Sequence, residues 1–367
     1  MSLDSRGRPV GQVTRQLAEA RGPVPPFALV RRRHRWRAWR HGALVAAAVL
    51  AVAAVVTVQV RQQASQDVTS RPRSFGRVAA SIGIGGQLGV VRADAAGVWV
   101  QRGGEVVRVD PQTNQVVARL PMRPPDSDLG AVGEGSLWLT QVAQGTVTRV
   151  DPATGRTVAT IRVPGAGAPE GIDVAVGPSA VWIAYDLGTL GGGIIARVDS
   201  ATNTVAATVR IPDLPGELAI GDRAVLVWTG HDSGVADQID PATNRVAARV
   251  PVCRGSNAVA SGAGAFRITC DEGTVLRVDP VGHRVDATVA LGGQAGSAGW
   301  VAADGSVVWV ANLEDTLFRV DSQTNTIVGS GSVTGPDGSY ITDLTVGPDA
   351  VWLTTSHGTL VRFDPDR

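Results

Sequence analysis

The stretch "VTRVDPATGRTVATIRV", residues 147–163, consists of two short apolar segments separated by a turn motif. In this motif, Pro presets φ, the Asp side chain can accept backbone N–H groups ahead of it, and Asn or Gly takes the left-handed conformation that returns the chain. The Val, Ile and Thr residues on both sides favour strands. Similar phrases occur at residues 106–122, 195–211, 236–252, 275–291 and 317–333. Because a catalytic motif usually occurs once, we interpret the recurring Asp as a turn cap and not as a catalytic or calcium-binding residue.

The spacing of these phrases defines a repeat of 39 to 48 residues. Each unit begins with a segment that ends in a Gly-rich turn, such as "GAVGEG" or "VAVGPS". An apolar segment such as "SLWL" or "AVWI" comes next, and the repeated phrase follows it. Four short strands at this period are typical of a β-propeller blade. The recurring aspartates indicate seven blades: Asp110, Asp151, Asp199, Asp240, Asp279, Asp321 and Asp364.

The two ends of the repeat region predict how the ring closes. The last unit stops at "LVRFDPDR" and lacks a fourth strand, whereas "GRVAASIGIG" (76–85) resembles the fourth-strand text "NRVAARVPVC" (244–253). We therefore predict an all-β, seven-bladed propeller whose last blade is completed by residues 77–84.

One position of the second strand carries Trp in five units and should fill the gaps between blades. Units four and five have Leu226 and Arg267 there. An Arg in such a layer needs a partner or an exit to solvent. The five tryptophans are Trp99, Trp138, Trp182, Trp309 and Trp352.

The region before the repeats differs from them in charge and hydropathy. Residues 1–41 carry ten Arg against Asp4 and Glu19, and we expect a mostly disordered basic tail, with one short amphipathic helix as the alternative. Residues 42–60 contain no charge and are long enough for a transmembrane helix. The Arg cluster before them predicts a cytoplasmic N-terminus. A cleaved signal peptide or a twin-arginine signal is the alternative to an uncleaved anchor.

These features predict a single-pass membrane protein, with residues 61–75 as a linker and residues 76–367 as an extracytoplasmic propeller. From residue 78 onward the chain holds twenty Arg and thirty acidic residues. This negative balance excludes binding of nucleic acid through phosphate neutralisation. We expect a monomer whose partner is an extracytoplasmic protein or a cell-envelope ligand.

The two cysteines are expected to form a disulfide. Cys253 ends the fourth strand of unit four, just before the first strand of unit five, and Cys270 ends the second strand of unit five. Because first and second strands run antiparallel, the start of one lies beside the end of the other. A location outside the cell favours oxidation of this pair.

The repeat resembles the YVTN-type propellers of bacterial surface proteins, most closely in "VWVANLEDTLFRVDSQTNTIV" (308–328), and the virginiamycin B lyase-like propellers. The resemblance covers residues 76–367 and implies the fold more strongly than a function, because this architecture hosts enzymes, sensors and adhesive modules. In the lyase family, a His is followed about one blade later by Glu-Gly-His, with the last His as general base and a magnesium ion nearby. Here His231 is followed by Glu272, Gly273 and Thr274, and Thr cannot take a proton near neutral pH as imidazole can.

Units four and five depart most from the repeat and therefore carry the predicted site. They place His231 and Asp232 on one loop, and Asp271 and Glu272 on the adjacent loop of the same face. Such a set could hold a divalent cation, Mg²⁺ or Ca²⁺, or a cationic ligand group; a solvated loop cluster is the alternative. We favour a ligand- or protein-binding module without catalysis, with a sensor as one form of it, over a Mg-assisted lyase. A second His or a Tyr facing His231 would favour the lyase, and an open channel lined by scattered acids would favour binding.

Overall fold

The computed structural model describes residues 75–366, apart from 125, 164, 166–168, 179, 189–190, 230–232, 293–297, 314 and 335–337. The expected basic tail, the expected transmembrane helix at 42–60 and nearly all of the linker lie outside these residues. Within the described part of the chain, no helix has the length and apolar character needed to cross a membrane.

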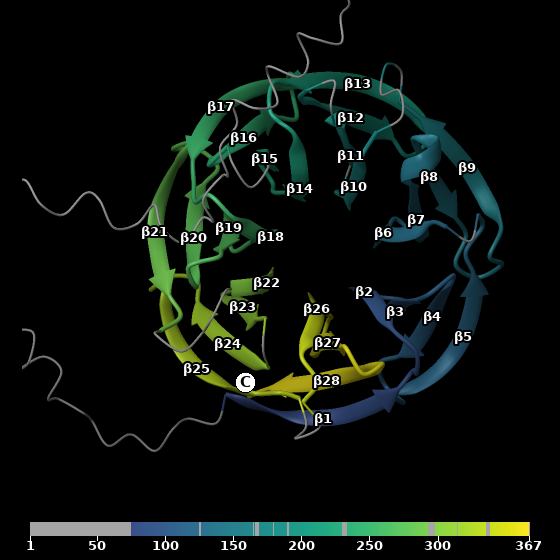
Figure 1. Cartoon of the computed structure of the whole chain (residues 1–367), viewed down its shortest axis with the longest axis vertical. Helices are drawn as coiled ribbons and strands as arrows, with labels where there is room; N and C mark the ends of the chain where they lie inside the picture. Colours follow the sequence, from purple (N-terminus) through teal and green to yellow (C-terminus); the bar gives the residue numbers. More distant parts are fainter. Residues whose placement is uncertain are drawn as a thin grey trace, which may run out of the picture. The chain divides into compact units, whose positions relative to one another are not determined.

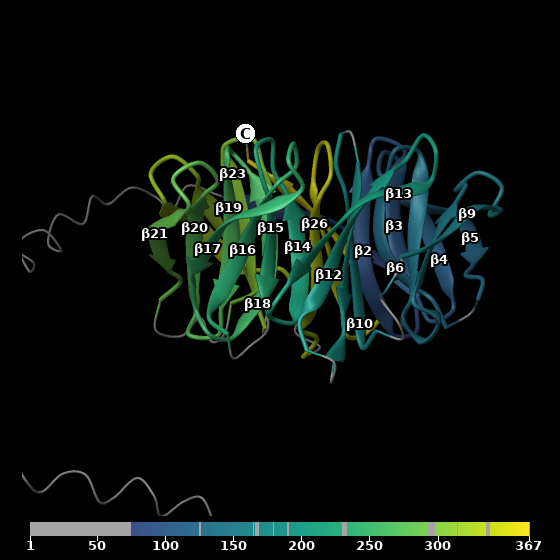
Figure 2. The ribbon, with the colours of Figure 1, turned by 90° about the horizontal axis from the view of Figure 1, so that it is seen from above.

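Seven four-stranded antiparallel sheets form a ring around a central channel, and one edge strand of each sheet is innermost (Figure 1). Viewed from the edge, the strands run across the thickness of the ring (Figure 2). This arrangement confirms the predicted seven-bladed propeller.

The strands have the following bounds. Blade 1 contains β2 (Leu88–Asp94), β3 (Gly97–Arg102), β4 (Glu105–Asp110) and β5 (Gln115–Pro121). Blade 2 contains β6 (Asp128–Gly133), β7 (Ser136–Gln141), the 3-10 turn η2 (Val142–Gln144), β8 (Thr146–Val150) and β9 (Thr157–Arg162). Blade 3 contains β10 (Gly171–Val176), β11 (Val181–Asp186), β12 (Gly193–Asp199) and β13 (Thr204–Ile211). Blade 4 contains β14 (Pro215–Ile220), β15 (Val225–Thr229), β16 (Val235–Asp240) and β17 (Arg245–Pro251). Blade 5 contains β18 (Ser256–Gly262), β19 (Ala265–Cys270), β20 (Thr274–Asp279) and β21 (Arg284–Ala290). Blade 6 contains β22 (Ala298–Asp304), β23 (Val307–Asn312), β24 (Thr316–Asp321) and β25 (Thr326–Ser332). Blade 7 contains β26 (Ile341–Val346), β27 (Val351–Thr355), β28 (Thr359–Pro365) and the N-terminal strand β1 (Gly76–Gly83).

The closing strand β1 pairs antiparallel with β28, from Gly76 opposite Pro365 to Gly83 opposite Thr359. Its N-terminal neighbour Phe75, the last residue of the expected linker, packs against Phe363 of the same blade, with ring centroids 4.9 Å apart. A side chain at Gly329 or Gly331 of β25 would collide with the Phe75 ring. The two glycines thus make room for an aromatic contact that fixes the closing strand.

The repeated turn motif adopts the expected geometry in all six complete copies. Its fifth residue has positive φ each time, between 51° at His283 and 66° at Gly155. The Asp carboxylate accepts the backbone N–H two residues ahead, as from Ala153 to Asp151 at 2.8 Å. Hydrogen bonds from within the turn lower the pKa of all six aspartates. The largest contribution comes from the Thr154 hydroxyl at Asp151 and from a backbone N–H two or three residues ahead at Asp110, Asp199, Asp240, Asp279 and Asp321. The turn-cap interpretation is therefore confirmed.

In blades 2, 3, 6 and 7, the recurring Arg before the turn donates to the corresponding turn of the next blade. In blade 2, the Arg149 guanidinium lies over the Trp138 ring, 5.2 Å from its centroid. Arg149 also donates to Ser200 O at 2.5 Å and Asn203 Oδ1 at 3.0 Å, both in the turn of blade 3. All five tryptophans at this position are buried, as predicted. The repeated phrase thus supplies both the donor of one blade and the acceptors of the next.

The outermost strand of each blade contains one extra, unpaired residue at the same place. This residue lies between the residue that pairs with the recurring Arg of the neighbouring strand (Gln238 in blade 4) and the residue that pairs with the apolar residue after that Arg. Such β-bulges twist an edge strand and interrupt its pairing pattern, which opposes edge-to-edge association. The seven bulged residues are Ala79, Val117, Val158, Ala206, Ala247, Asp286 and Val328.

Candidate functional site

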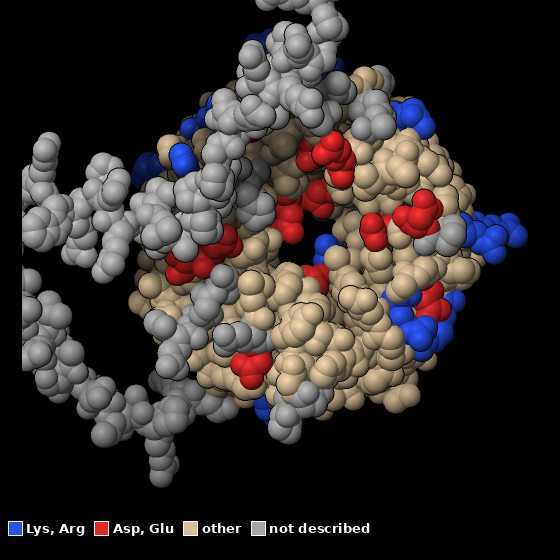
Figure 3. All heavy atoms as spheres, viewed as in Figure 1, with Lys and Arg blue, Asp and Glu red and all other residues tan. Residues whose placement is uncertain are grey.

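The central channel contains a cavity of about 340 Å³ that is lined by the innermost strands of all seven blades. Most lining residues are Ala, Val, Leu or Ser, and the four charged ones are Arg92, Asp173, Glu217 and Asp343. Acidic side chains gather around the central opening, whereas most basic side chains of this face lie at the outer edge of the ring (Figure 3). The channel is therefore a water-accessible cavity with three carboxylates against one guanidinium.

The three carboxylates occupy the same position of their strands. Each directly precedes an apolar residue, in "GIDVAV", "PGELAI" and "ITDLTV". Side chains alternate between the faces of a strand, so this position repeatedly points into the channel when the strand is innermost. Blades 5 and 6 have Ala258 and Trp300 before the corresponding apolar residue.

Asp343 is the most firmly held of the three carboxylates. Its Oδ2 accepts from Arg92 Nη1 and from the backbone N–H of Val91, both at 2.8 Å, and its Oδ1 accepts from Leu344 N at 2.8 Å. Arg92 also donates from Nε to Gly130 O at 3.1 Å. Asp343 and Arg92 thus form an ion pair that joins blades 7, 1 and 2 at the channel wall.

Among the described residues, Asp173 and Glu217 have backbone hydrogen-bond partners only. Asp173 Oδ2 accepts from Leu218 N at 2.8 Å, and Glu217 Oε2 accepts from Val259 N at 3.0 Å. Because Leu218 follows Glu217 directly, the two carboxylates are neighbours on the channel wall. Within the described part of the chain, neither of them forms an ion pair.

The channel shifts the pKa values of these groups upward. Burial within the ring, followed by the charge of Asp173, raises the pKa of Glu217 to about 8, although the Val259 N–H and Arg92 oppose the shift. Burial also raises the pKa of Asp173. Water reaches Glu217 through the channel, but protein surrounds the carboxylate and replaces much of the bulk solvent. For Arg92, burial acts against the charge, but the three carboxylates outweigh it and raise the pKa.

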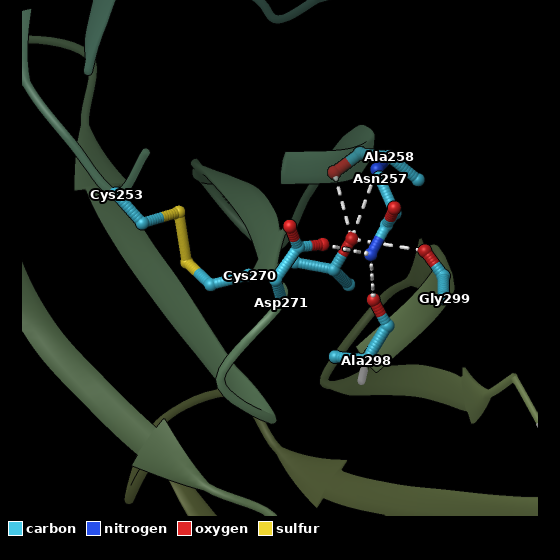
Figure 4. Close-up of a disulfide and its surroundings, with 8 residues drawn as sticks. Cys253, Asn257, Ala258, Cys270, Asp271, Ala298 and Gly299 are labelled. Atoms are coloured by element: carbon cyan, nitrogen blue, oxygen red, sulfur yellow. Dashed lines mark hydrogen bonds between the residues drawn. A yellow bond between two sulfur atoms is a disulfide. The ribbon is translucent and has the colours of Figure 1, made fainter. Parts of the chain in front are cut away.

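The site that the sequence predicts is only partly described. His231 and Asp232 lie outside the described residues, so their contribution stays a prediction. Asp271 and Glu272 are exposed in the turn between β19 and β20. Asp271 Oδ1 accepts from Asn257 Nδ2 at 2.9 Å, and the same Nδ2 donates to Ala298 O of blade 6 at 2.7 Å (Figure 4). Asp271 therefore has a structural role between blades 5 and 6.

The predicted disulfide is present beside this turn. Cys253 and Cys270 are bonded, with their Cα atoms 6.1 Å apart, and link the connection after β17 to the end of β19 (Figure 4). On the same strand, the buried Thr269 accepts from Ala258 N at 2.9 Å and donates to Gly299 O at 2.9 Å. Blade 5 is thus connected to blade 4 by a covalent bond and to blade 6 by hydrogen bonds.

Arg267, which replaces the blade 5 Trp, is buried and has no exit to solvent. Its guanidinium donates to Phe266 O at 3.2 Å and to Ser322 O of blade 6 at 3.5 Å. Its cross-strand neighbour Arg277 forms an ion pair with Asp286, the bulged residue of β21. Burial, and then the nearby Arg277, lower the pKa of Arg267 to about 10.

Among the residues that the structure describes, no group of three or more His, Cys, Asp or Glu side chains is placed to hold a metal ion. A divalent cation at the predicted loop site stays a prediction, because two of its four residues are not described.

Comparison with known proteins adds no relative. No family model matches the sequence, and no curated protein matches it.

The sequence reasoning missed the four charged channel residues. Asp173, Glu217 and Asp343 stand in otherwise apolar strand segments, and the alignment of the repeat places them at one position. An acidic residue at the same position of three repeats is therefore the sequence signal that could have identified these carboxylates.

Proposed function

We propose that this chain is a binding module without catalysis, and that its ligand presents a cationic group to the central channel. The observation that carries this proposal is the channel lining, in which Asp173 and Glu217 form no ion pair among the described residues, whereas Arg92 pairs with Asp343. A positively charged ligand group would relieve the repulsion between Asp173 and Glu217. An open channel lined by scattered acids is also the feature that the sequence reasoning associates with binding.

The proposal can be tested by calorimetric titration of the full chain with spermidine, magnesium chloride and calcium chloride. Spermidine carries organic ammonium groups, whereas the two salts probe the divalent cation predicted at the loop site. We expect spermidine to bind the wild type and to lose affinity at least about tenfold in an Asp173→Asn/Glu217→Gln variant.

A matched variant, Asp271→Asn/Glu272→Gln, separates the channel from the predicted loop site. It removes the same formal charge at the surface, so equal losses in both variants would indicate non-specific attraction and contradict a channel site. A loss only in the loop variant would place binding around His231, Asp232, Asp271 and Glu272.

We further propose that residues 42–60 anchor the chain in the membrane, with the propeller outside the cytoplasm. The basic flank before this segment, its lack of charge and the disulfide of the propeller support this orientation. Protease treatment of intact spheroplasts should remove the propeller. Full protection of the propeller in sealed cells would contradict the orientation.

The resemblance to YVTN-type and virginiamycin B lyase-like propellers supports the binding architecture more than a reaction. Thr274 stands where the lyase family has its general base, and it begins β20, the third strand of blade 5. We therefore assign no reaction to the chain.

A further inference from the structure

Three channel carboxylates join consecutive blades in the same way. Each accepts a hydrogen bond from the innermost strand of the next blade: Asp343 from Val91, Asp173 from Leu218, and Glu217 from Val259. The first contact joins blades 7 and 1, and the other two join blades 3, 4 and 5. The channel wall thus contains one isolated contact and two contacts in series.

The charges around these contacts are unequal. The contact between blades 7 and 1 includes the Arg92 guanidinium, which pairs with Asp343. The two serial contacts place Asp173 and Glu217 side by side. On the other described innermost strands, β6, β18 and β22, no charged side chain lines the channel. Asp173 and Glu217 therefore face only each other and the Arg92–Asp343 pair.

Two neighbouring carboxylates in a confined space do not both ionise readily. One of them retains its proton until the pH is well above the ordinary pKa of a carboxyl group. A protonated carboxyl still accepts a backbone hydrogen bond through its carbonyl oxygen. One proton therefore lets both contacts form without repulsion, and loss of that proton opposes both.

We infer that Asp173 and Glu217 form a proton-dependent latch that holds the innermost strands of blades 3, 4 and 5 together, while the Arg92–Asp343 pair holds blades 7 and 1 independently of that proton. The latch describes the channel without a ligand, because a cationic group bound between the two carboxylates would take the place of the proton.

The direction of the pH dependence follows from the raised pKa of Glu217. Between its ordinary value of 4.5 and about 8, the closed form binds more protons than an opened or unfolded form. The contacts should therefore be strongest at the acidic end of this window and weaken as the pH rises to about 8. Opening should increase by at most about tenfold per pH unit, because one proton is involved, and should level off above that.

The test is hydrogen exchange of the full chain between pH 5.5 and 9, read by mass spectrometry on peptides that cover β14, β18 and β2 and corrected for intrinsic exchange rates. We expect protection of Leu218 and Val259 to fall with rising pH up to about 8, and protection of Val91 to stay constant. In Glu217→Gln, the pH dependence at Leu218 and Val259 should disappear.

Asp343→Asn is the matched control. It should lower protection at Val91 at every pH and leave the pH dependence at Leu218 and Val259 in place. Equal pH dependence at all three amides, or an unchanged dependence in Glu217→Gln, would overturn the latch. If Glu217→Gln does not fold, Asp173→Asn must abolish the same dependence.

Discussion

Blades 2 and 5 are built from the same repeat but contact the next blade through different groups. In blade 2, Arg149 lies over Trp138 and reaches Asn203 of blade 3. In blade 5, Arg267 takes the place of Trp, and Arg277 turns to Asp286 within its own blade.

The acceptors in the next turn also differ between blades. Asn203 Oδ1 is satisfied by Arg149, whereas Asn325 Oδ1, at the same place in the turn of blade 6, is buried without a hydrogen-bond partner among the described residues. Asn244 Oδ1 in the turn of blade 4 is likewise unpaired there, although Arg197 of blade 3 donates to Pro241 O of that turn.

Arg267 reaches only Ser322 O of the blade 6 turn, at 3.5 Å. The comparison teaches that blade 5, with Arg in place of Trp, contacts the next blade through Arg267, while Arg277 pairs within its own blade. The disulfide and Thr269 supply connections in blade 5 that blade 2 lacks.

The largest expected effect comes from removing the buried Trp that packs between blades. Trp138→Ala should lower the free energy of unfolding by about 3–5 kcal/mol, because it leaves a cavity and removes the ring under Arg149. Urea denaturation measures this loss. Leu226→Ala in blade 4 is the control and should cost less than Trp138→Ala in the same assay, because it deletes fewer atoms. A loss below about 1 kcal/mol in Trp138→Ala would contradict the role of this residue.

The disulfide should contribute the next largest amount. A Cys253→Ser/Cys270→Ser variant should lose about 3 kcal/mol on the chain-entropy model for a loop of this length. Limited proteolysis should then cut blade 5 before blade 2. As a control, the unreduced wild type should show no reactive thiols after denaturation; two reactive thiols would refute the bond.

Placing Trp at position 267, as in the regular blades, tests whether blade 5 depends on its arginine. Arg267→Trp should raise the free energy of unfolding by about 1 kcal/mol, because it removes a buried charge and offers Arg277 a ring to lie over. Adding Asp286→Ala removes the ion-pair partner of Arg277, so that Arg277 can donate to Asn325 Oδ1. The double variant should keep the higher free energy of unfolding. A lower midpoint of urea denaturation in Arg267→Trp would show that blade 5 depends on its arginine.

The smallest effect concerns a feature that the two blades share. The turn carboxylates Asp151 and Asp279 have lowered pKa values, so their contribution to stability is present above the ordinary value of 3.8 and is lost as the pH falls through the lowered one. Asp151→Asn and Asp279→Asn should each flatten the decline of the melting temperature below about pH 4 by a similar small amount. A clear difference between the two variants would break the equivalence of these turns.

The sequence allowed the ring, its closing strand, the turn caps, the buried tryptophans and the disulfide to be predicted, because each depends on residues close in sequence or on the period itself. The contacts from Arg149 to Asn203 could not be predicted, since they join different repeats through side-chain reach. The channel carboxylates were missed for a similar reason. A lone acid in an apolar strand, such as Asp173, gains its neighbours only when the innermost strands surround one axis.

The pairing of β1 with β28 has a consequence for biosynthesis. These are the first and last strands that the structure describes, yet they share one sheet. A ribosome therefore releases β1 long before its partner exists, and the intermediate blades can form first. Ring closure becomes the final step of folding and demands the longest loop closure in the domain. Until β1 pairs with it, β28 presents an unpaired edge to the surroundings, which leaves the chain vulnerable to misassembly at this stage.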